Sequence, residues 1–137
     1  MNDYTEKMLL LIDFCRKESN KCIRRIQAEK VLLDAGVSSD KSKEIVLRDS
    51  AANAAYLEAI NTLIQSYSGD GEMTSKQAIV NVLDKIQKDA ERLNKELGEI
   101  SLETYIEYRV HTIQGQVDAH QSILKHLNIT TDDSEKI

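Results

Sequence analysis

A seven-residue apolar repeat between Ile79 and Ile100 is the feature that most restricts what this chain can fold into. Apolar residues alternate there in steps of four and three, at Ile79, Leu83, Ile86, Ala90, Leu93, Leu97 and Ile100. This spacing places one apolar stripe along one face of a helix, as in coiled coils. The residues between the stripe positions are mostly charged or carry amides, so the other faces suit water. Such a helix needs other helices to cover its stripe.

The chain of 137 residues contains no proline, although average usage of about 5% predicts about seven. Because proline interrupts helices, its absence predicts long uninterrupted ones. Glycine is also scarce, and four of the five glycines stand in turn-like contexts, at Gly36, Gly69, Gly71 and Gly98. The expected helices are residues 3–35, residues 40–67, a third that starts at the capping box of Thr74 and Gln77 and ends at Gly98, and a fourth from about Ser101.

The first and fourth expected helices each show an inward apolar stripe. In the first helix the stripe is Tyr4, Met8, Leu11, Cys15, Ser19, Cys22, Ile26 and Leu33. In the fourth helix it is Leu102, Ile106, Val110, Ile113, Val117, Leu124 and Leu127. This pattern leaves Gly115 facing away from the core, in a row with His111, Ala119, Ser122 and His126. A glycine there indicates either the close approach of another backbone or ligand, or drift at an exposed position.

Short connections join neighbouring helices that run in opposite directions. The predicted fold is therefore all-α: an up-down-up-down four-helix bundle of long antiparallel helices that self-associates. One domain covers residues 1–129, and residues 130–137 form an acidic disordered tail. As an alternative, the first two helices open out and complete their packing with a second copy, because heptad spacing alone fits both arrangements.

The chain is a small acidic protein with a formal net charge of −5. This charge argues against general binding of nucleic acid or anionic membranes, although a local basic stripe can bind phosphate in an acidic protein. The longest apolar run, Met8 to Ile12, is far too short to span a membrane, and no leader sequence is recognisable, so we expect a cytoplasmic protein. Cys15 and Cys22 stand seven residues apart on one expected helix, about 10 Å, which exceeds disulfide reach. We expect reduced thiols.

No motif indicates catalysis. The chain has no Gly-rich phosphate loop and no Glu-x-x-His pair of the kind that holds metals in helical bundles. His120 lies at the edge of the fourth-helix stripe, where Cys15 could approach it, but zinc needs about four ligands and no others occur at helical spacing. We therefore expect a satisfied or half-exposed histidine, no catalytic residue, no metal ligand, no cofactor, and a protein that is not an enzyme.

Asp49 is the residue that fits its position least, because it falls in the inward stripe of the second helix between Ile45 and Ala52. A buried carboxylate must be paired or neutral. Counting outward from the turns places Arg109 and Lys30 within its reach. We expect a structural ion pair that fixes helix register, with a polar ligand pocket or simple exposure as alternatives.

The first helix carries a second, outward face that changes from apolar to basic along its length. Its residues are Leu10, Phe14, Lys17, Lys21 and Arg24, with Arg25 alongside. A monomeric bundle would leave both apolar members exposed, so this face predicts a protein interface. The predicted function is a non-catalytic adaptor, chaperone, inhibitor or assembly subunit that binds a protein partner, or a second copy as a homodimer, through these residues. The alternative is a binding module for nucleic acid or a small anionic ligand, and steep salt dependence would distinguish it.

Overall fold

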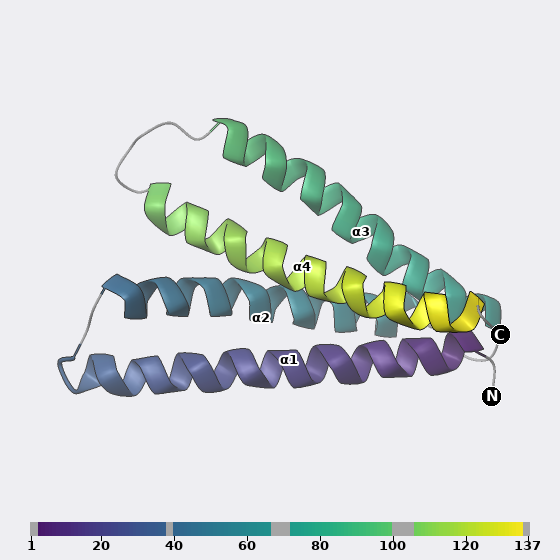
Figure 1. Cartoon of the computed structure of the whole chain (residues 1–137), viewed down its shortest axis with the longest axis horizontal. Helices are drawn as coiled ribbons and strands as arrows, with labels where there is room; N and C mark the ends of the chain where they lie inside the picture. Colours follow the sequence, from purple (N-terminus) through teal and green to yellow (C-terminus); the bar gives the residue numbers. More distant parts are fainter. Residues whose placement is uncertain (1–2, 38–39, 67–71, 100–105, 136–137) are drawn as a thin grey trace.

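The described residues of the computed structural model form four long helices (Figure 1). They are α1 (Asp3–Asp34), α2 (Asp40–Ser66), α3 (Glu72–Glu99) and α4 (Ile106–Glu135). The structure describes residues 3–37, 40–66, 72–99 and 106–135, with side chains described for 4–37, 40–65, 74–96 and 109–127. Within these ranges the chain is helical except for a turn at residues 35–37 and contains no strand. The predicted all-helical class and the four helices are confirmed.

The end of α1 follows the prediction from sequence. Gly36 adopts a φ of 78°, in the left-handed region that glycine enters without steric cost. The backbone N–H of Gly36 donates to the Leu33 carbonyl at 3.1 Å, and that of Val37 donates to the Leu32 carbonyl at 2.8 Å. This pair of hydrogen bonds is a Schellman motif, which satisfies carbonyl groups that the helix end leaves open.

The limits of α3 differ from the prediction. The helix begins at Glu72 rather than at Thr74, and it continues through Gly98 to Glu99. The Thr74–Gln77 capping box is therefore inside the helix, and Gly98 is a helical residue rather than a cap. A glycine within a helix costs only about 1 kcal/mol relative to alanine, so its presence does not force a helix to end.

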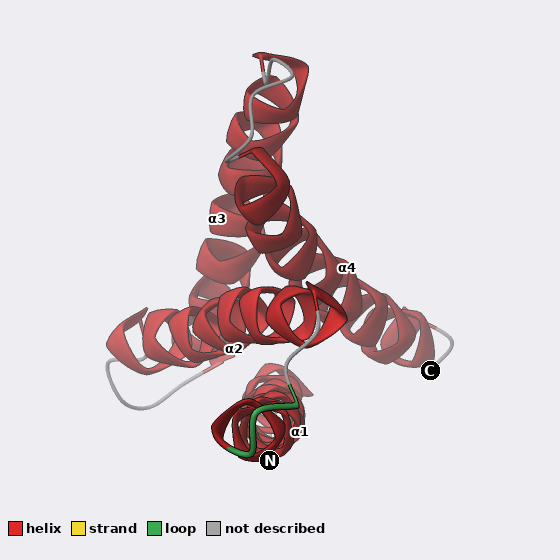
Figure 2. Cartoon of the chain, turned by 90° about the vertical axis from the view of Figure 1, so that its left-hand side faces the viewer, coloured by secondary structure: helices red, strands yellow, loops and turns green. Residues whose placement is uncertain are grey.

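The four helices are not equally close to one another. α1 and α2 lie side by side, whereas α3 and α4 lean away from them (Figure 1), and the end view shows α3 and α4 spreading in different directions (Figure 2). α2 contacts all three other helices, most extensively α1 and α4, while α3 and α4 contact each other least. The antiparallel up-down-up-down course remains a prediction.

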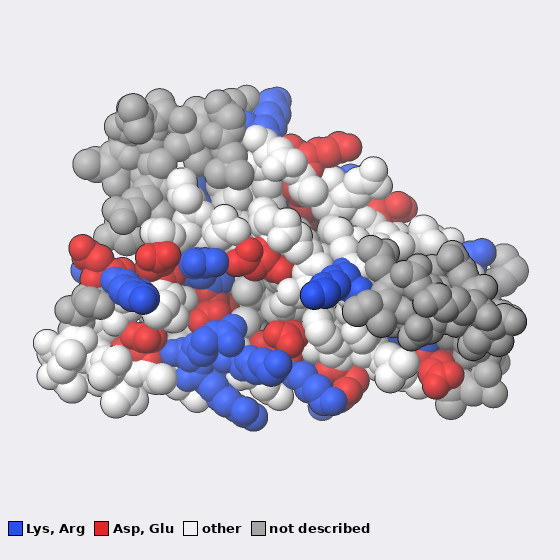
Figure 3. Space-filling view, viewed as in Figure 1, with Lys and Arg blue, Asp and Glu red and all other residues white. Residues whose placement is uncertain are grey.

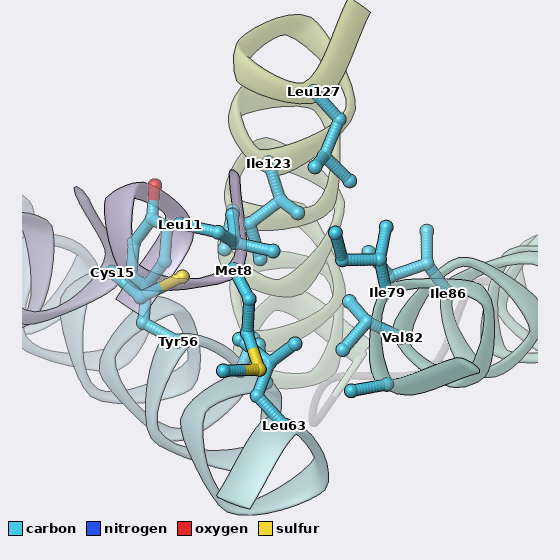
Figure 4. Close-up of a cluster of buried hydrophobic side chains, with 14 of the residues drawn as sticks. Met8, Leu11, Cys15, Tyr56, Leu63, Ile79, Val82, Ile86, Ile123 and Leu127 are labelled. Atoms are coloured by element: carbon cyan, nitrogen blue, oxygen red, sulfur yellow. The ribbon is translucent and has the colours of Figure 1, made fainter. Parts of the chain in front are cut away.

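The hydrophobic core receives side chains from all four helices. The labelled residues converge between the helices in Figure 4, with Met8 and Leu11 from α1, Leu63 from α2, Val82 from α3 and Ile123 from α4. The inner stripe of α1 is confirmed at its buried positions, which are Met8, Leu11, Cys15, Ser19 and Cys22. On α3 the stripe is buried at Ile79, Ile86 and Leu93, whereas the side chains of Leu97 and Ile100 lie outside the described residues.

The buried face of α4 is rotated from the predicted one. Gly115 and Ala119 are buried, although the pattern placed them outward, and Val110 and Val117 are only half-buried. Small residues allow α4 to lie close to α2, which turns their side of the helix inward. The side chains of Leu102 and Ile106, the first two members of the predicted stripe, fall outside the described residues.

The helix α4 extends to Glu135 and so includes most of the predicted tail. The side chains beyond residue 127 are outside the described part of the chain, and the domain limit at residue 129 stays a prediction. Among the described helices, none combines the length and the apolar character that crossing a membrane requires.

Candidate functional site

The backbones of α2 and α4 come close together at Gly115. A Cβ atom placed on this glycine would overlap the backbone carbonyl group of Arg48. Ala119, one turn further along α4, is completely buried. Of the two readings of Gly115 from the sequence, the close approach of another backbone is therefore the correct one.

A groove opens between α1 and α4, with α2 as its floor. α4 lies on α2 but diverges from α1 toward its own N-terminal end (Figure 1). The groove has a volume of about 480 Å³ and is lined by Cys22 and Ala28 of α1, Ala52 and Tyr56 of α2, and Ala119 and Ser122 of α4, among other residues. Its floor on α2 combines the apolar or aromatic side chains of Ile45, Ala52 and Tyr56 with the charged side chains of Arg48 and Asp49.

A second hollow of about 310 Å³ continues this groove along α4. Both spaces are lined by Glu18 and Ser122, and the second also by Phe14, Lys125 and His126. The joined space runs along α1 from Phe14 to Glu29, which is about four helical turns. We call this space the α1–α4 groove.

Two ion pairs between helices border the groove. The Arg25 guanidinium on α1 donates from Nε and Nη2 to the two carboxylate oxygens of Asp49 on α2, each at 2.9 Å. Arg48 Nη2 on α2 donates to Asp118 Oδ2 on α4 at 2.8 Å. The hydrogen bonds that Arg25 donates to Asp49 raise the pKa of Arg25, and the one that Arg48 donates to Asp118 raises the pKa of Arg48, in each case against the effect of burial. Each pair ties one wall of the groove to its floor.

Asp49 has a different partner from the one predicted. Its side chain is only 13% exposed and is paired, as expected for a structural ion pair, but the cation is Arg25 rather than Arg109 or Lys30. Arg109 instead donates to Glu96 of α3, with Nη2 at 2.7 Å from Oε2. The predicted partners follow only if all four helices lie parallel to one axis, so that residues equally far from a turn are at the same height. Because α4 diverges from α1, Arg109 lies beside α3 instead. Asp49 also lines the groove, so the ion pair and the polar pocket occur together.

The apolar end of the predicted interface is divided between the surface and the groove. Leu10 is 47% exposed, as expected. Phe14 is only half-buried rather than fully exposed, because its ring is stacked on His126 with centroids 4.5 Å apart and meets Tyr56 edge-on at 6.3 Å. The prediction that Phe14 would lie on an open outer face is therefore wrong, since the C-terminal part of α4 passes beside it.

The basic residues of the predicted interface gather along the middle of α1, interleaved with acidic ones (Figure 3). Lys17 pairs with Asp13 at 2.9 Å, and Lys21 pairs with Glu18 at 3.1 Å. Arg24 is exposed and forms no ion pair with the residues that the structure describes. With Arg25 bound to Asp49, the predicted basic stripe is largely balanced by carboxylates of its own chain.

His120 lines a separate, small cavity between α2, α3 and α4. The side chain is buried, and its Nδ1 atom has no hydrogen-bond partner among the described residues. Glu58, Lys85 and Asp89 also line the cavity, which has a volume of about 10 Å³ and so offers room for roughly one water molecule. Burial lowers the pKa of His120, and the Asp89 and Glu58 carboxylates oppose this effect. His120 is therefore neutral near pH 7.

Both cysteines are buried free thiols, which agrees with the expectation of reduced residues. Burial, with a smaller contribution from the Glu18 carboxylate, raises the pKa of Cys15 to about 12. Burial also raises the pKa of Cys22. The thiolate form needed for nucleophilic attack is therefore scarce at neutral pH. No group of three or more potential metal ligands occurs within the described ranges.

Comparisons with protein-family models, curated protein sequences and solved structures found no match to this chain. The site therefore rests on the geometry alone. Neither the α1–α4 groove nor the Arg48–Asp118 pair that borders it was predicted from the sequence. The signal in the sequence is the row of Gly115, Ala119, Ser122 and His126. These residues line the groove, although the apolar pattern of α4 places them outward.

Proposed function

We propose that this chain is a non-catalytic cytoplasmic interaction protein that binds a helical segment of a protein partner in the α1–α4 groove. The observation that carries the proposal is the open groove of about 480 Å³, extended by the hollow beside Phe14. Amphipathic helices bind in such grooves by placing their apolar face on the floor and their polar flanks on the walls. The role would be that of an adaptor, chaperone, inhibitor or assembly subunit.

The shape and chemistry of the groove support a helix as the ligand. The small side chains of Ala28, Ala52 and Ala119 let another backbone come close, and the buried Tyr56 closes the floor beneath them. The Arg25–Asp49 and Arg48–Asp118 pairs hold the walls in place before binding, which reduces the ordering cost on association. Leu10 and Arg24 extend the contact surface outside the groove.

The charges favour a protein over a phosphate-bearing ligand. Four carboxylates line the main groove, from Glu18, Glu29, Asp49 and Asp118, against the two guanidinium groups of Arg25 and Arg48. Lys17, Lys21 and Arg25 each have a carboxylate within about 3 Å. A phosphate would have to compete with these carboxylates, so nucleic acid and small anions remain the less favoured alternative.

The proposal includes the up-down-up-down course of antiparallel helices. It is supported by the contacts Phe14–Tyr56, Ser19–Asn53 and Arg25–Asp49, in which the residue numbers rise on α1 as they fall on α2. The cytoplasmic location is supported by the two free thiols.

A photo-cross-linking amino acid placed in the groove tests the proposal. Ala28 is exposed and lines the groove, whereas the neighbouring Gln27 is exposed but does not, so Ala28 and Gln27 form a matched pair of positions. In the cell of origin, we expect the Ala28 position to give one discrete protein adduct, insensitive to nuclease, and the Gln27 position to give little of it. Binding of that protein, once purified, should be weakened at least tenfold by Ala28→Trp and not by Gln27→Trp. A nuclease-sensitive adduct, or equal adducts from both positions, would contradict the proposal.

A further inference from the structure

α2 carries a second heptad pattern on the side away from the core. Its positions follow steps of three and four residues: Leu47, Ser50, Ala54, Leu57, Asn61 and Ile64. All are exposed except Leu47, which is half-buried, with Leu57 at 44% and Ile64 at 58% exposure. We call this set the α2 outer seam.

The α2 outer seam is unusual because none of its residues is charged. Charged side chains make up 30% of the chain, and the solvent face of a helix is where they normally concentrate. Between Asp49 and the end of α2 the only charged residue is Glu58, and it pairs with Lys85 of α3 at 2.5 Å. An uncharged exposed stripe with a 3-4 spacing is suited to packing against another helix.

We propose that the α2 outer seam packs against the same seam of a second copy of this chain, with the two α2 helices antiparallel around a two-fold axis beside Leu57. In a two-fold interface, if residue i contacts residue j, then j also contacts i. An axis beside Leu57 places Ile64 opposite Ser50 of the second copy, and Asn61 within about one residue of the level of Ala54. The larger side chain thus meets the smaller one at both of these levels, and Leu57 meets its own counterpart. This match of sizes within one seam identifies a second copy as the occupant.

Exposed residues of α1 continue the same surface. The Ser19–Asn53 hydrogen bond joins α1 to α2 at the edge away from the α1–α4 groove. Beyond Ser19 on that side of α1 lie Leu9, Arg16 and Ile23, seven residues apart on one line of the helix. Leu9 is 49% exposed and Ile23 is 38% exposed, so this line is apolar at both ends.

The two-fold axis also matches the charges of α1. The contacts Phe14–Tyr56 and Ser19–Asn53 show that Leu57 is level with about residue 14 of α1. The axis therefore brings Arg16 of one copy near Asp13 of the other. Both side chains are exposed, and Arg16 forms no ion pair with the residues that the structure describes. Asp13 pairs with Lys17 of its own chain but stays 58% exposed, so each copy supplies one cation and one accessible carboxylate to a reciprocal contact. An axis chosen from the α2 side chains alone thus also gives complementary charges on α1.

This interface differs from the self-association expected from the sequence, which used Leu10 and Phe14. Phe14 is covered by Tyr56 and His126 and lines the α1–α4 groove, on the other side of the α1–α2 pair. The dimer through the α2 outer seam therefore leaves the groove open. The dimer and the proposed function can therefore be tested independently of each other.

Light scattering of the full chain tests the dimer. We expect the wild type to have the mass of two chains at micromolar concentrations, and Leu57→Glu with Ile64→Glu to have the mass of one chain at unchanged helicity. Leu10→Glu is the matched control, because Leu10 is similarly exposed but lies off the seam, and this variant should keep the dimeric mass.

Cross-linking locates the axis without relying on a charged variant. The native thiols are buried, so a new surface thiol can be oxidised selectively. Leu57→Cys should form a disulfide-linked dimer under mild oxidation, whereas Val31→Cys, exposed on α1, should not. A wild-type mass of one chain across the micromolar range would overturn the proposal. So would dissociation by Leu10→Glu with the seam variants remaining dimeric.

Discussion

Gly115 of α4 lies so close to Arg48 of α2 that a Cβ atom on the glycine would overlap the Arg48 carbonyl oxygen. The contact brings the two backbones together at the point where Arg48 also binds Asp118 through its side chain. The depth of the α1–α4 groove depends on this approach, because α4 forms one wall and α2 forms the floor.

We expect Gly115→Ala to lower the free energy of unfolding by about 1–3 kcal/mol, the usual range for an inserted methyl group that forces packed elements apart. At an open helical site the same change would instead add about 1 kcal/mol of stability. Urea denaturation measures the change in the free energy of unfolding. A decrease indicates close backbone packing at Gly115, whereas an increase indicates an open helical site. Gln121→Ala, at an exposed residue of the same helix, should remain within about 0.5 kcal/mol of wild type.

A double-mutant cycle can identify the partner of Asp49. Asp49→Ala combined with Arg25→Ala should reveal a coupling of about 1 kcal/mol, which is reduced from the value for buried charged hydrogen bonds because Arg25 is 52% exposed. Asp49→Ala combined with Arg109→Ala should be additive, because the two residues belong to separate ion pairs. Equal coupling in both cycles would contradict the observed pairing.

Phe14 and Leu10 should respond differently to truncation. Phe14→Ala removes ring contacts with Tyr56 and His126 and should cost about 2 kcal/mol, less than the 3–5 kcal/mol of a fully buried phenylalanine. Leu10→Ala should cost under about 1 kcal/mol because the side chain is already half in water. Thermal or urea unfolding of the two variants measures this contrast, and a similar cost for both would mean that Phe14 is exposed.

Stability should decrease in mildly acidic solution because of His120. Burial lowers the pKa of His120 below its ordinary value of 6.5, so the unfolded chain takes up a proton at a higher pH than the folded chain does. The stability that comes from keeping His120 neutral is fully present above about pH 6.5 and is lost as the pH falls below this value. The Asp89 and Glu58 carboxylates oppose the shift, while Arg92 of α3 adds to it.

The measurement is the urea midpoint at pH 7.5 and pH 5.5 for wild type and His120→Gln. The variant should show a smaller loss of stability between the two pH values, because it cannot titrate. His126, whose pKa is also lowered by burial, supplies a comparison through His126→Gln. A loss as large in His120→Gln as in wild type would assign the effect to other groups.

The amino-acid sequence alone determined the local structure of this protein. The absence of proline and the apolar spacing indicated four helices, Gly36 marked the end of α1, and the inner face of α1 was correct from Met8 to Cys22. These features depend on interactions within a few residues, such as the three- and four-residue spacing of a helix and the φ preference of glycine. Asp49 was also recognised as a residue that needs a counter-charge, because burying a lone carboxylate is costly anywhere in a fold.

Only the tertiary structure decided how the helices are rotated and which side chains meet. The rotation of α4 depends on the fit of Gly115 against the backbone of α2, a contact between residues 67 positions apart that no periodic pattern contains. That rotation places His126 against Phe14. Because α4 diverges from α1, Arg109 lies away from Asp49, which pairs with Arg25 instead, and the groove between α1 and α4 is open. A helix can bury any of several faces with a similar gain from apolar burial. The face that carries small residues is selected here because it lets the two backbones come close.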